Sequence, residues 1–190
     1  MSIEDAIQNY NERLIEGQLA SQGRPGKQRG LGGALFESLA DDLVACSDRQ
    51  LAPNRFVTSR EIDGLSLGNI QVDKHLEYNG RLETLVECKA YIEASMLKRV
   101  VYDFNEVCQS PDGGYVRKLA VLAGQSSIAD VTRVFTTSVC KQLTGLDLEI
   151  FVVNTAKHRD STKQLFDPAF SDNFTLDPAE VERFVHWLST

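Results

Sequence analysis

The chain has 190 residues, of which 42% are hydrophobic and 25% are charged. This composition excludes a disordered chain, and the length predicts a single domain spanning residues 1–190. The longest apolar runs, residues 119–123 and 150–153, are far shorter than the roughly 18 residues that a membrane helix needs. Acidic residues at positions 4 and 5 do not fit a secretion signal, so we expect a cytoplasmic protein.

The charge balance is acidic, with 20 basic and 27 acidic residues and a net charge of −7. This balance argues against a protein that coats nucleic acid nonspecifically, although it leaves room for a local basic face. Four cysteines, at positions 46, 88, 108 and 140, are too widely spaced for a zinc or redox motif. We therefore expect free thiols, most of them buried.

The N-terminal part of the chain predicts two helices joined by a loop. Apolar residues at helical spacing predict a helix over residues 2–21, and Ser2 with Asp5 resembles a capping box. The glycine-rich stretch at residues 22–33 predicts a loop. The apolar stripe that follows predicts a second helix over residues 34–47.

The middle of the chain predicts strands, and the rest predicts alternating helices and strands. Strands are expected at residues 56–59, 67–77 and 82–91, with Asn79-Gly80 as a hairpin turn between the last two. Further elements are a helix over 92–109, a strand over 115–123, a helix over 126–143, a strand over 146–154 and a helix over 177–189. This order predicts a mixed α/β domain.

The hairpin register decides whether its acidic residues share a face. Side chains alternate along a strand, so a two-residue turn with continuous pairing would place Asp73 and Glu87 on opposite faces. A three-residue loop, residues 78–80 with Gly80 left-handed, aligns the apolar faces of the two strands. We therefore expect this loop, with Asp73 opposite Leu85 and diagonal to Glu87, at roughly 7–8 Å.

Two carboxylates and a lysine on one strand face suit metal-assisted cleavage of a phosphodiester. Asp73 and Glu87 offer hard oxygen ligands for Mg²⁺, and the Lys89 ammonium can orient the attacking water. The alternative is an ordinary solvated sheet surface, because the Glu87-x-Lys89 tripeptide alone is not specific. His75 is predicted on the same face, either near the metal or as a surface histidine.

In this context the chain resembles the PD-(D/E)xK nuclease superfamily, the fold of most type II restriction endonucleases. The family pattern is an acid on one strand, an acid-x-Lys on the next antiparallel strand, and then a helix, strand, helix and strand. Asp73 matches the first acid, Glu87 the second and Lys89 the lysine. Val72 stands where the pattern has proline.

The resemblance covers roughly residues 34–154 and implies two further site residues. The backbone carbonyl of Cys88 matches an additional metal ligand, and Glu37 matches an acid that many members carry on the preceding helix. The implied fold is a restriction-endonuclease-like mixed sheet in αβββαβ order, flanked by helices, with extra N-terminal and C-terminal helices.

The resemblance implies a Mg²⁺-dependent, sequence-specific endodeoxyribonuclease that cuts double-stranded DNA, as in restriction-modification. Because one site cleaves one phosphodiester, we expect a homodimer acting on a short palindromic site. Two alternatives stay open. One is a repair or recombination nuclease of the same fold, and the other is a catalytically silent module that only binds.

An acidic nuclease needs a local basic lining to hold DNA. The candidates come from the glycine-rich stretch and from the segment after the last core strand: Arg24, Lys27, Arg29, Lys157 and Arg159. The alternatives are a basic flexible linker for the first three residues and a solvated turn for the others.

Overall fold

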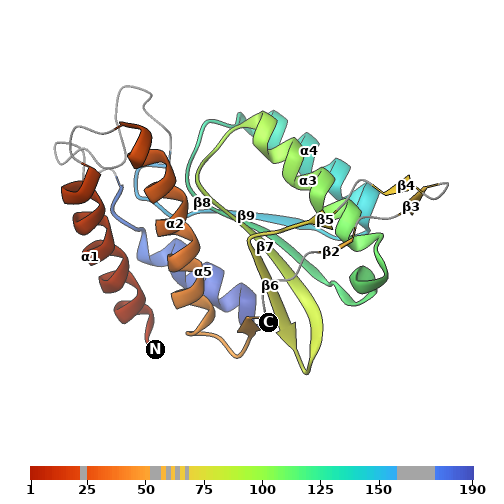
Figure 1. The fold of residues 1–190 in the computed structure, drawn as a ribbon, viewed down its shortest axis with the longest axis horizontal. Coiled ribbons are helices and arrows are strands. Elements are labelled where there is room, and N and C mark those ends of the chain that lie inside the picture. Colours follow the sequence, from red (N-terminus) through yellow and green to blue (C-terminus); the bar gives the residue numbers. More distant parts are fainter. Residues whose placement is uncertain (22–24, 52–56, 59–60, 63–64, 67–68, 158–173) are drawn as a thin grey trace.

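A five-stranded mixed sheet with helices on both faces forms the body of the protein (Figure 1). The computed structural model describes residues 1–21, 25–51, 57–58, 61–62, 65–66, 69–157 and 174–190, with the backbone alone at 21, 25–30, 57–58, 61–62, 65–66, 69 and 111–112. The expectation of a mixed α/β fold is confirmed at this level.

The elements alternate along the chain after an initial pair of helices. The helices are α1 (Ile3–Ser21), α2 (Pro25–Val44), α3 (Ala94–Cys108), α4 (Asp130–Thr144) and α5 (Pro178–Ser189), with a short 3-10 helix at Pro111–Tyr115. The main sheet contains β1 (Gln50–Leu51), β6 (Lys74–Tyr78), β7 (Arg81–Ile92), β8 (Lys118–Ser126) and β9 (Leu148–Val152). Two small ribbons pair β2 (Val57–Thr58) with β5 (Asn69–Ile70) and β3 (Glu61–Ile62) with β4 (Leu65–Ser66).

The sheet order is β1-β6-β7-β8-β9, antiparallel through β7 and parallel from β7 to β9. Helices α1, α2 and α5 bury one face of the sheet, and α3 and α4 bury the other. Residues 119–123 of β8 are fully buried, because a central parallel strand is covered on both faces.

The first helix begins as expected. The Ser2 backbone N–H donates to Asp5 Oδ2 (3.0 Å), and the Asp5 N–H donates to Ser2 Oγ (3.1 Å), which completes the capping box. The prediction of a loop over residues 22–33 is wrong from Pro25 onward, because α2 begins there. Proline is favoured in the first turn, and burial of the C-terminal half of α2 outweighs the roughly 1 kcal/mol that each helical glycine costs.

The predicted three-residue hairpin loop is also wrong. Tyr78 pairs with Arg81, and the two turn residues both have positive φ, 52° at Asn79 and 72° at Gly80. This is the left-handed geometry that an Asn-Gly turn adopts most readily. The hairpin therefore closes with the two-residue turn that the apolar pattern argued against.

A β-bulge realigns the apolar faces of the two hairpin strands, which the two-residue turn alone would place on opposite sides of the sheet. Glu77 pairs with Leu82, whereas Leu76 pairs with Thr84, so Glu83 is an extra residue on β7. An extra residue shifts the face alternation by one. Beyond the bulge Lys74 pairs with Val86, which places Asp73 next to Glu87 rather than opposite Leu85.

The predicted strand over residues 67–77 is interrupted before β6. Residues 71 and 72 lie outside strands, and Asp73 forms a bend. As a result Val72 packs with the core under α3, whereas Leu76 packs with the core under α2. A continuous strand over residues 67–77 would place these two side chains on one face, but the bend between them places them on opposite faces.

The C-terminal helix is capped as its sequence predicts. Asp177 accepts a hydrogen bond from the Ala179 N–H at 3.1 Å, and Pro178 is the first helical residue. Trp187 packs on the core beside Phe151 and Phe184. Within the described ranges, no helix combines the length and apolar character that a membrane crossing requires.

Candidate active site

The two carboxylates and the lysine that the sequence singles out meet at the start of β6 and the middle of β7. The Lys89 ammonium donates to Glu87 Oε1 and also contacts Asp73 Oδ2 at 3.3 Å. Asp73 Oδ2 accepts the Cys88 backbone N–H at 2.8 Å, and the Asp73 N–H donates to Glu87 Oε2 at 3.4 Å. One cation is thus held between two carboxylates.

The site is partly shielded from solvent, which strengthens the electrostatic interactions between its charged groups. The side chains of Lys89, Asp73 and Glu87 are 30%, 23% and 14% exposed. Burial raises the pKa of Glu87, and the neighbouring Asp73 charge raises it further. Burial alone would lower the pKa of Lys89, but Glu87 and Asp73 outweigh it and the pKa is raised. The lysine therefore stays charged.

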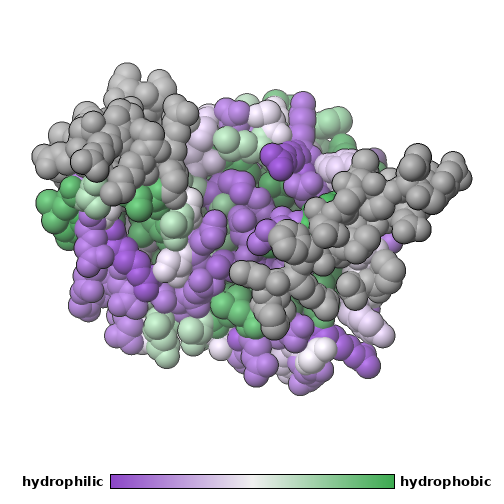
Figure 2. Space-filling view, in the orientation of Figure 1, coloured by the Kyte–Doolittle hydropathy of each residue, from purple (hydrophilic) through white to green (hydrophobic). Residues whose placement is uncertain are grey.

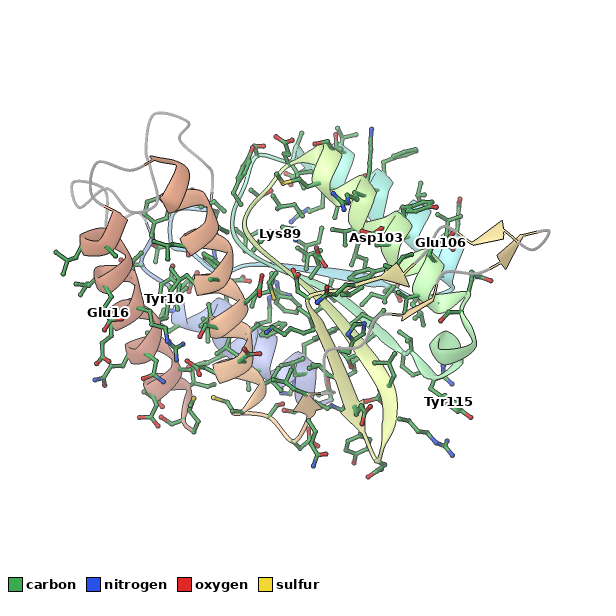
Figure 3. The ribbon with its side chains drawn as sticks, in the orientation of Figure 1. Tyr10, Glu16, Lys89, Asp103, Glu106 and Tyr115 are labelled. Carbon is green, nitrogen blue, oxygen red and sulfur yellow. The ribbon has the colours of Figure 1, made fainter. Side chains whose placement is uncertain are left out.

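The sheet presents this group on the side of α3. Leu85, two residues before Glu87, packs under α3, and alternation along β7 directs Glu87 and Lys89 the same way. Figure 3 shows Lys89 in the space between α2 and α3, with Asp103 on α3. Hydrophilic residues gather in the same region in the space-filling view (Figure 2).

Asp103 is a third acid near the site that the sequence analysis missed. Burial raises its pKa, while the positive charges of Arg99 and then Lys89 oppose that rise. Arg99 Nε lies 3.7 Å from Asp103 Oδ2. The i,i+4 spacing of these two residues on α3 was the available sequence signal.

Glu37 lies on the other side of the sheet. It is exposed on α2, which covers the face opposite to α3. One turn later on the same helix, Asp41 binds Lys74 at 2.6 Å, which accounts for a lysine among the apolar residues of β6. In the described part of the chain, no hydrogen bond or ion pair joins Glu37 to Asp73, Glu87 or Lys89.

His75 is not a surface histidine, which was one of the two alternatives for it. It is buried, and it pairs with Leu85 in the hairpin. The Cys88 side chain is also buried, with its pKa raised well above the ordinary value by burial, so its sulfur stays a neutral thiol. Cys88 reaches the site only through its backbone.

The five candidate DNA-binding residues are only partly described. Lys157 donates to the Val152 carbonyl at 2.7 Å and to Asp177 Oδ2 at 2.9 Å, so it also ties β9 to the start of α5. Lys27 and Arg29 lie in the first turns of α2, but their side chains, together with Arg24 and Arg159, lie outside the described residues.

The donor set fits a magnesium ion whose shell is completed by water and phosphate. Among the side chains that the structure describes, there is no cluster of three or more histidines, cysteines or acids suited to a metal. Magnesium is nevertheless usually held by one or two carboxylates, with waters and substrate phosphates as its other ligands. Asp73 and Glu87 provide two carboxylates that already converge on one cation.

No family model matches the chain, and no curated protein matches it.

Proposed function

We propose that the protein is a Mg²⁺-dependent endodeoxyribonuclease of the PD-(D/E)xK type, cutting double-stranded DNA as type II restriction enzymes do. The observation that carries the proposal is the convergence of Asp73 and Glu87 on the Lys89 ammonium. This charged group is only partly exposed, and removing charged side chains from water costs free energy of folding. Groups of this kind are concentrated at functional sites.

The order of elements supports the fold part of the proposal. Helix α2 is followed by the antiparallel strands β1, β6 and β7, then by α3, β8, α4 and β9. This is the αβββαβ order of the nuclease core with one more helix and strand, and the β2–β5 segment is inserted between β1 and β6. Helices α1 and α5 are the extra terminal helices.

Each site residue has a distinct role in the proposed reaction. Asp73 and Glu87 would hold magnesium, which supplies Lewis-acid stabilisation of the charge developing on the phosphate. Lys89 orients the attacking water and offsets the negative charge of the carboxylates. The Cys88 N–H fixes the Asp73 carboxylate through its 2.8 Å hydrogen bond. The Cys88 carbonyl is proposed as a supporting group.

A digest of DNA of known sequence tests the proposal. With magnesium we expect discrete fragments whose mapped ends share one sequence, and with calcium we expect binding without cleavage. Intact DNA with magnesium and folded protein would overturn the proposal, and cleavage confined to branched junctions would favour the repair or recombination alternative. A Glu87→Gln protein purified in parallel controls for contaminating nuclease.

A homodimer is part of the proposal, because a double-strand cut by one type of chain is made most simply by two sites related by two-fold symmetry. The surface that suits a second copy is the outer face of α4, which exposes Val131, Val134 and Phe135 at 77%, 62% and 65%. Its charged residues are paired, Arg133 with Asp130 at 3.1 Å and Lys141 with Asp147 at 2.8 Å. Although each copy has a net charge of −7, the α4 faces of two copies would therefore not repel each other.

Sedimentation of a Val134→Ser/Phe135→Ser variant tests this interface. We expect the wild type to be a dimer that linearises plasmid and the variant to be a monomer that only nicks it. Tyr102→Ser, which removes an exposed ring from α3, is the matched control and should remain a dimer. A wild-type monomer that linearises plasmid without accumulating nicked circles would contradict the dimer.

A further inference from the structure

A groove separate from the candidate active site opens at the turn end of the β6–β7 hairpin. It measures about 440 Å³, and its lining residues come from the hairpin and from the segment leading into β8: Tyr78, Asn79, Arg81, Glu83, Tyr115 and Arg117. Glu87 is six residues along β7 from Arg81, which places the groove about 20 Å from the acids. Figure 3 shows Tyr115 well away from Lys89.

The groove combines exposed aromatic rings with arginines. Tyr78 and Tyr115 are 42% and 51% exposed. Arg49 lies over the Tyr78 ring, with its guanidinium carbon 4.3 Å from the centroid, and Arg81 lies over the Tyr115 ring at 4.8 Å. Each arginine holds its ring in place, which reduces the entropy that the ring would lose on stacking against a ligand.

The charge of the groove is positive although the protein is acidic. Glu83, the acid in the lining, pairs with buried Arg49, whose Nη1 lies 2.6 Å from Glu83 Oε2 and whose Nε lies 3.6 Å from Asp48 Oδ1. Among the side chains described, no carboxylate forms an ion pair with Arg81 or Arg117, and both are exposed. Behind the groove, burial lowers the pKa of Lys118, and the positive charge of Arg49 lowers it further.

Arg117 is positioned to present its guanidinium to a ligand. Its Nη1 donates to the Gly114 and Val116 carbonyls at 3.1 and 2.9 Å, which fixes one edge of the group. Within the described residues, Nε and Nη2 of Arg117 have no hydrogen-bond partner, and two neighbouring donors of a planar guanidinium can bind two oxygens of one phosphate.

We propose that this groove binds single-stranded DNA, with phosphates at Arg81 and Arg117 and an unpaired base stacked on Tyr115. Aromatic rings interleaved with arginines are the usual means of holding a single strand without reading its sequence. A duplex is less suited, because its bases are covered on both faces by their neighbours. The site goes beyond the proposed cleavage reaction and needs no metal.

Fluorescence anisotropy measures binding of a 5′-labelled oligonucleotide of twelve thymidines, in EDTA to prevent cleavage, and tests whether the groove binds a single strand. Tyr115→Ala should weaken binding about tenfold, and Tyr115→Phe should restore it, because stacking needs only the ring. Tyr102→Ala is the control, since it removes an equally exposed tyrosine from α3. Arg81→Gln/Arg117→Gln should flatten the salt dependence, with a slope lower by about 1.4 for two lost phosphate contacts. Arg133→Gln, on α4, should leave that slope unchanged.

Several results would overturn the proposal. These are unchanged affinity in Tyr115→Ala with the fold intact, an equal loss in Tyr102→Ala, equal affinity for an abasic oligonucleotide, or tighter binding of the matching duplex. Binding of thymidine monophosphate alone, with no gain for the oligonucleotide, would identify a nucleotide site instead and also reject it. Because no metal is present, failure here leaves the cleavage proposal intact, whereas absence of magnesium-dependent cleavage would leave the groove intact.

Discussion

Replacing either carboxylate of the candidate active site by its amide should reduce magnesium-dependent DNA cleavage by about 100-fold or more. Glu87→Gln and Asp73→Asn each remove one negative charge of the proposed metal site. Both amides keep an oxygen that can accept the existing hydrogen bonds, from Lys89 in one case and from the Cys88 N–H in the other. The measurement is the initial rate of plasmid cleavage at saturating magnesium.

The stability of these variants separates a catalytic role from a structural one. Each change weakens a bond to Lys89 but also relieves repulsion between Asp73 and Glu87, so the free energy of unfolding should change by only about 1 kcal/mol. Glu77→Gln, a half-buried acid nearer the turn of the same hairpin, is the matched control and should cleave at the wild-type rate. Full activity in Asp73→Asn or Glu87→Gln would remove these residues from the proposed site.

The second large effect is on stability: Gly124→Ala should destabilise the fold by about 3 kcal/mol. A Cβ at this position of β8 would lie 2.4 Å from Phe36 Cζ and 2.6 Å from the Ala90 carbonyl oxygen. The backbone of β7 cannot move away without disturbing its pairing with β8. Thermal unfolding should show a midpoint lower by about 6–12 °C.

Two further variants show whether the close approach is the cause. Gly33→Ala, with no atom within 4 Å of the added Cβ, should stabilise α2 by up to about 1 kcal/mol. Phe36→Leu should recover part of the loss in the Gly124→Ala background, because it removes the contact with the ring but not the one with Ala90. Equal stability of Gly124→Ala and the wild type would contradict the packing argument.

The amino-acid sequence determined those features of this protein that depend on neighbouring residues. Ser2 with Asp5 and Asp177 with Pro178 predicted helix starts that the structure confirms, because caps act within one turn. The apolar run at residues 119–123 lies in a strand that the sequence predicted and that the structure confirms as β8. Asp73, Glu87 and Lys89 were also predicted to share a face, and they do.

The tertiary structure decided how the three residues come to share that face. The predicted route, a three-residue loop, was wrong, because Asn79-Gly80 forms its favoured two-residue turn and Glu83 supplies the extra residue as a bulge. The spacing of buried Leu82 and Leu85 was a possible signal, since apolar residues three apart on one face of a strand require such a shift. Arg49, distant in sequence, binds Glu83 at the bulge.

Long-range packing also decided the features that no local pattern specified. Asp103 approaches the site only because α3 folds back over β7. Glycine composition predicted a loop at residues 22–33, but a helix forms from Pro25 onward, since burial against the sheet outweighs the low helix propensity of glycine. Local sequence thus specified the helix caps, the spacing of apolar residues along helices and strands, and the types of reactive side chain. The pairing register of the strands and the approach of distant elements required the complete fold, because their free energy comes from contacts between residues far apart in the chain.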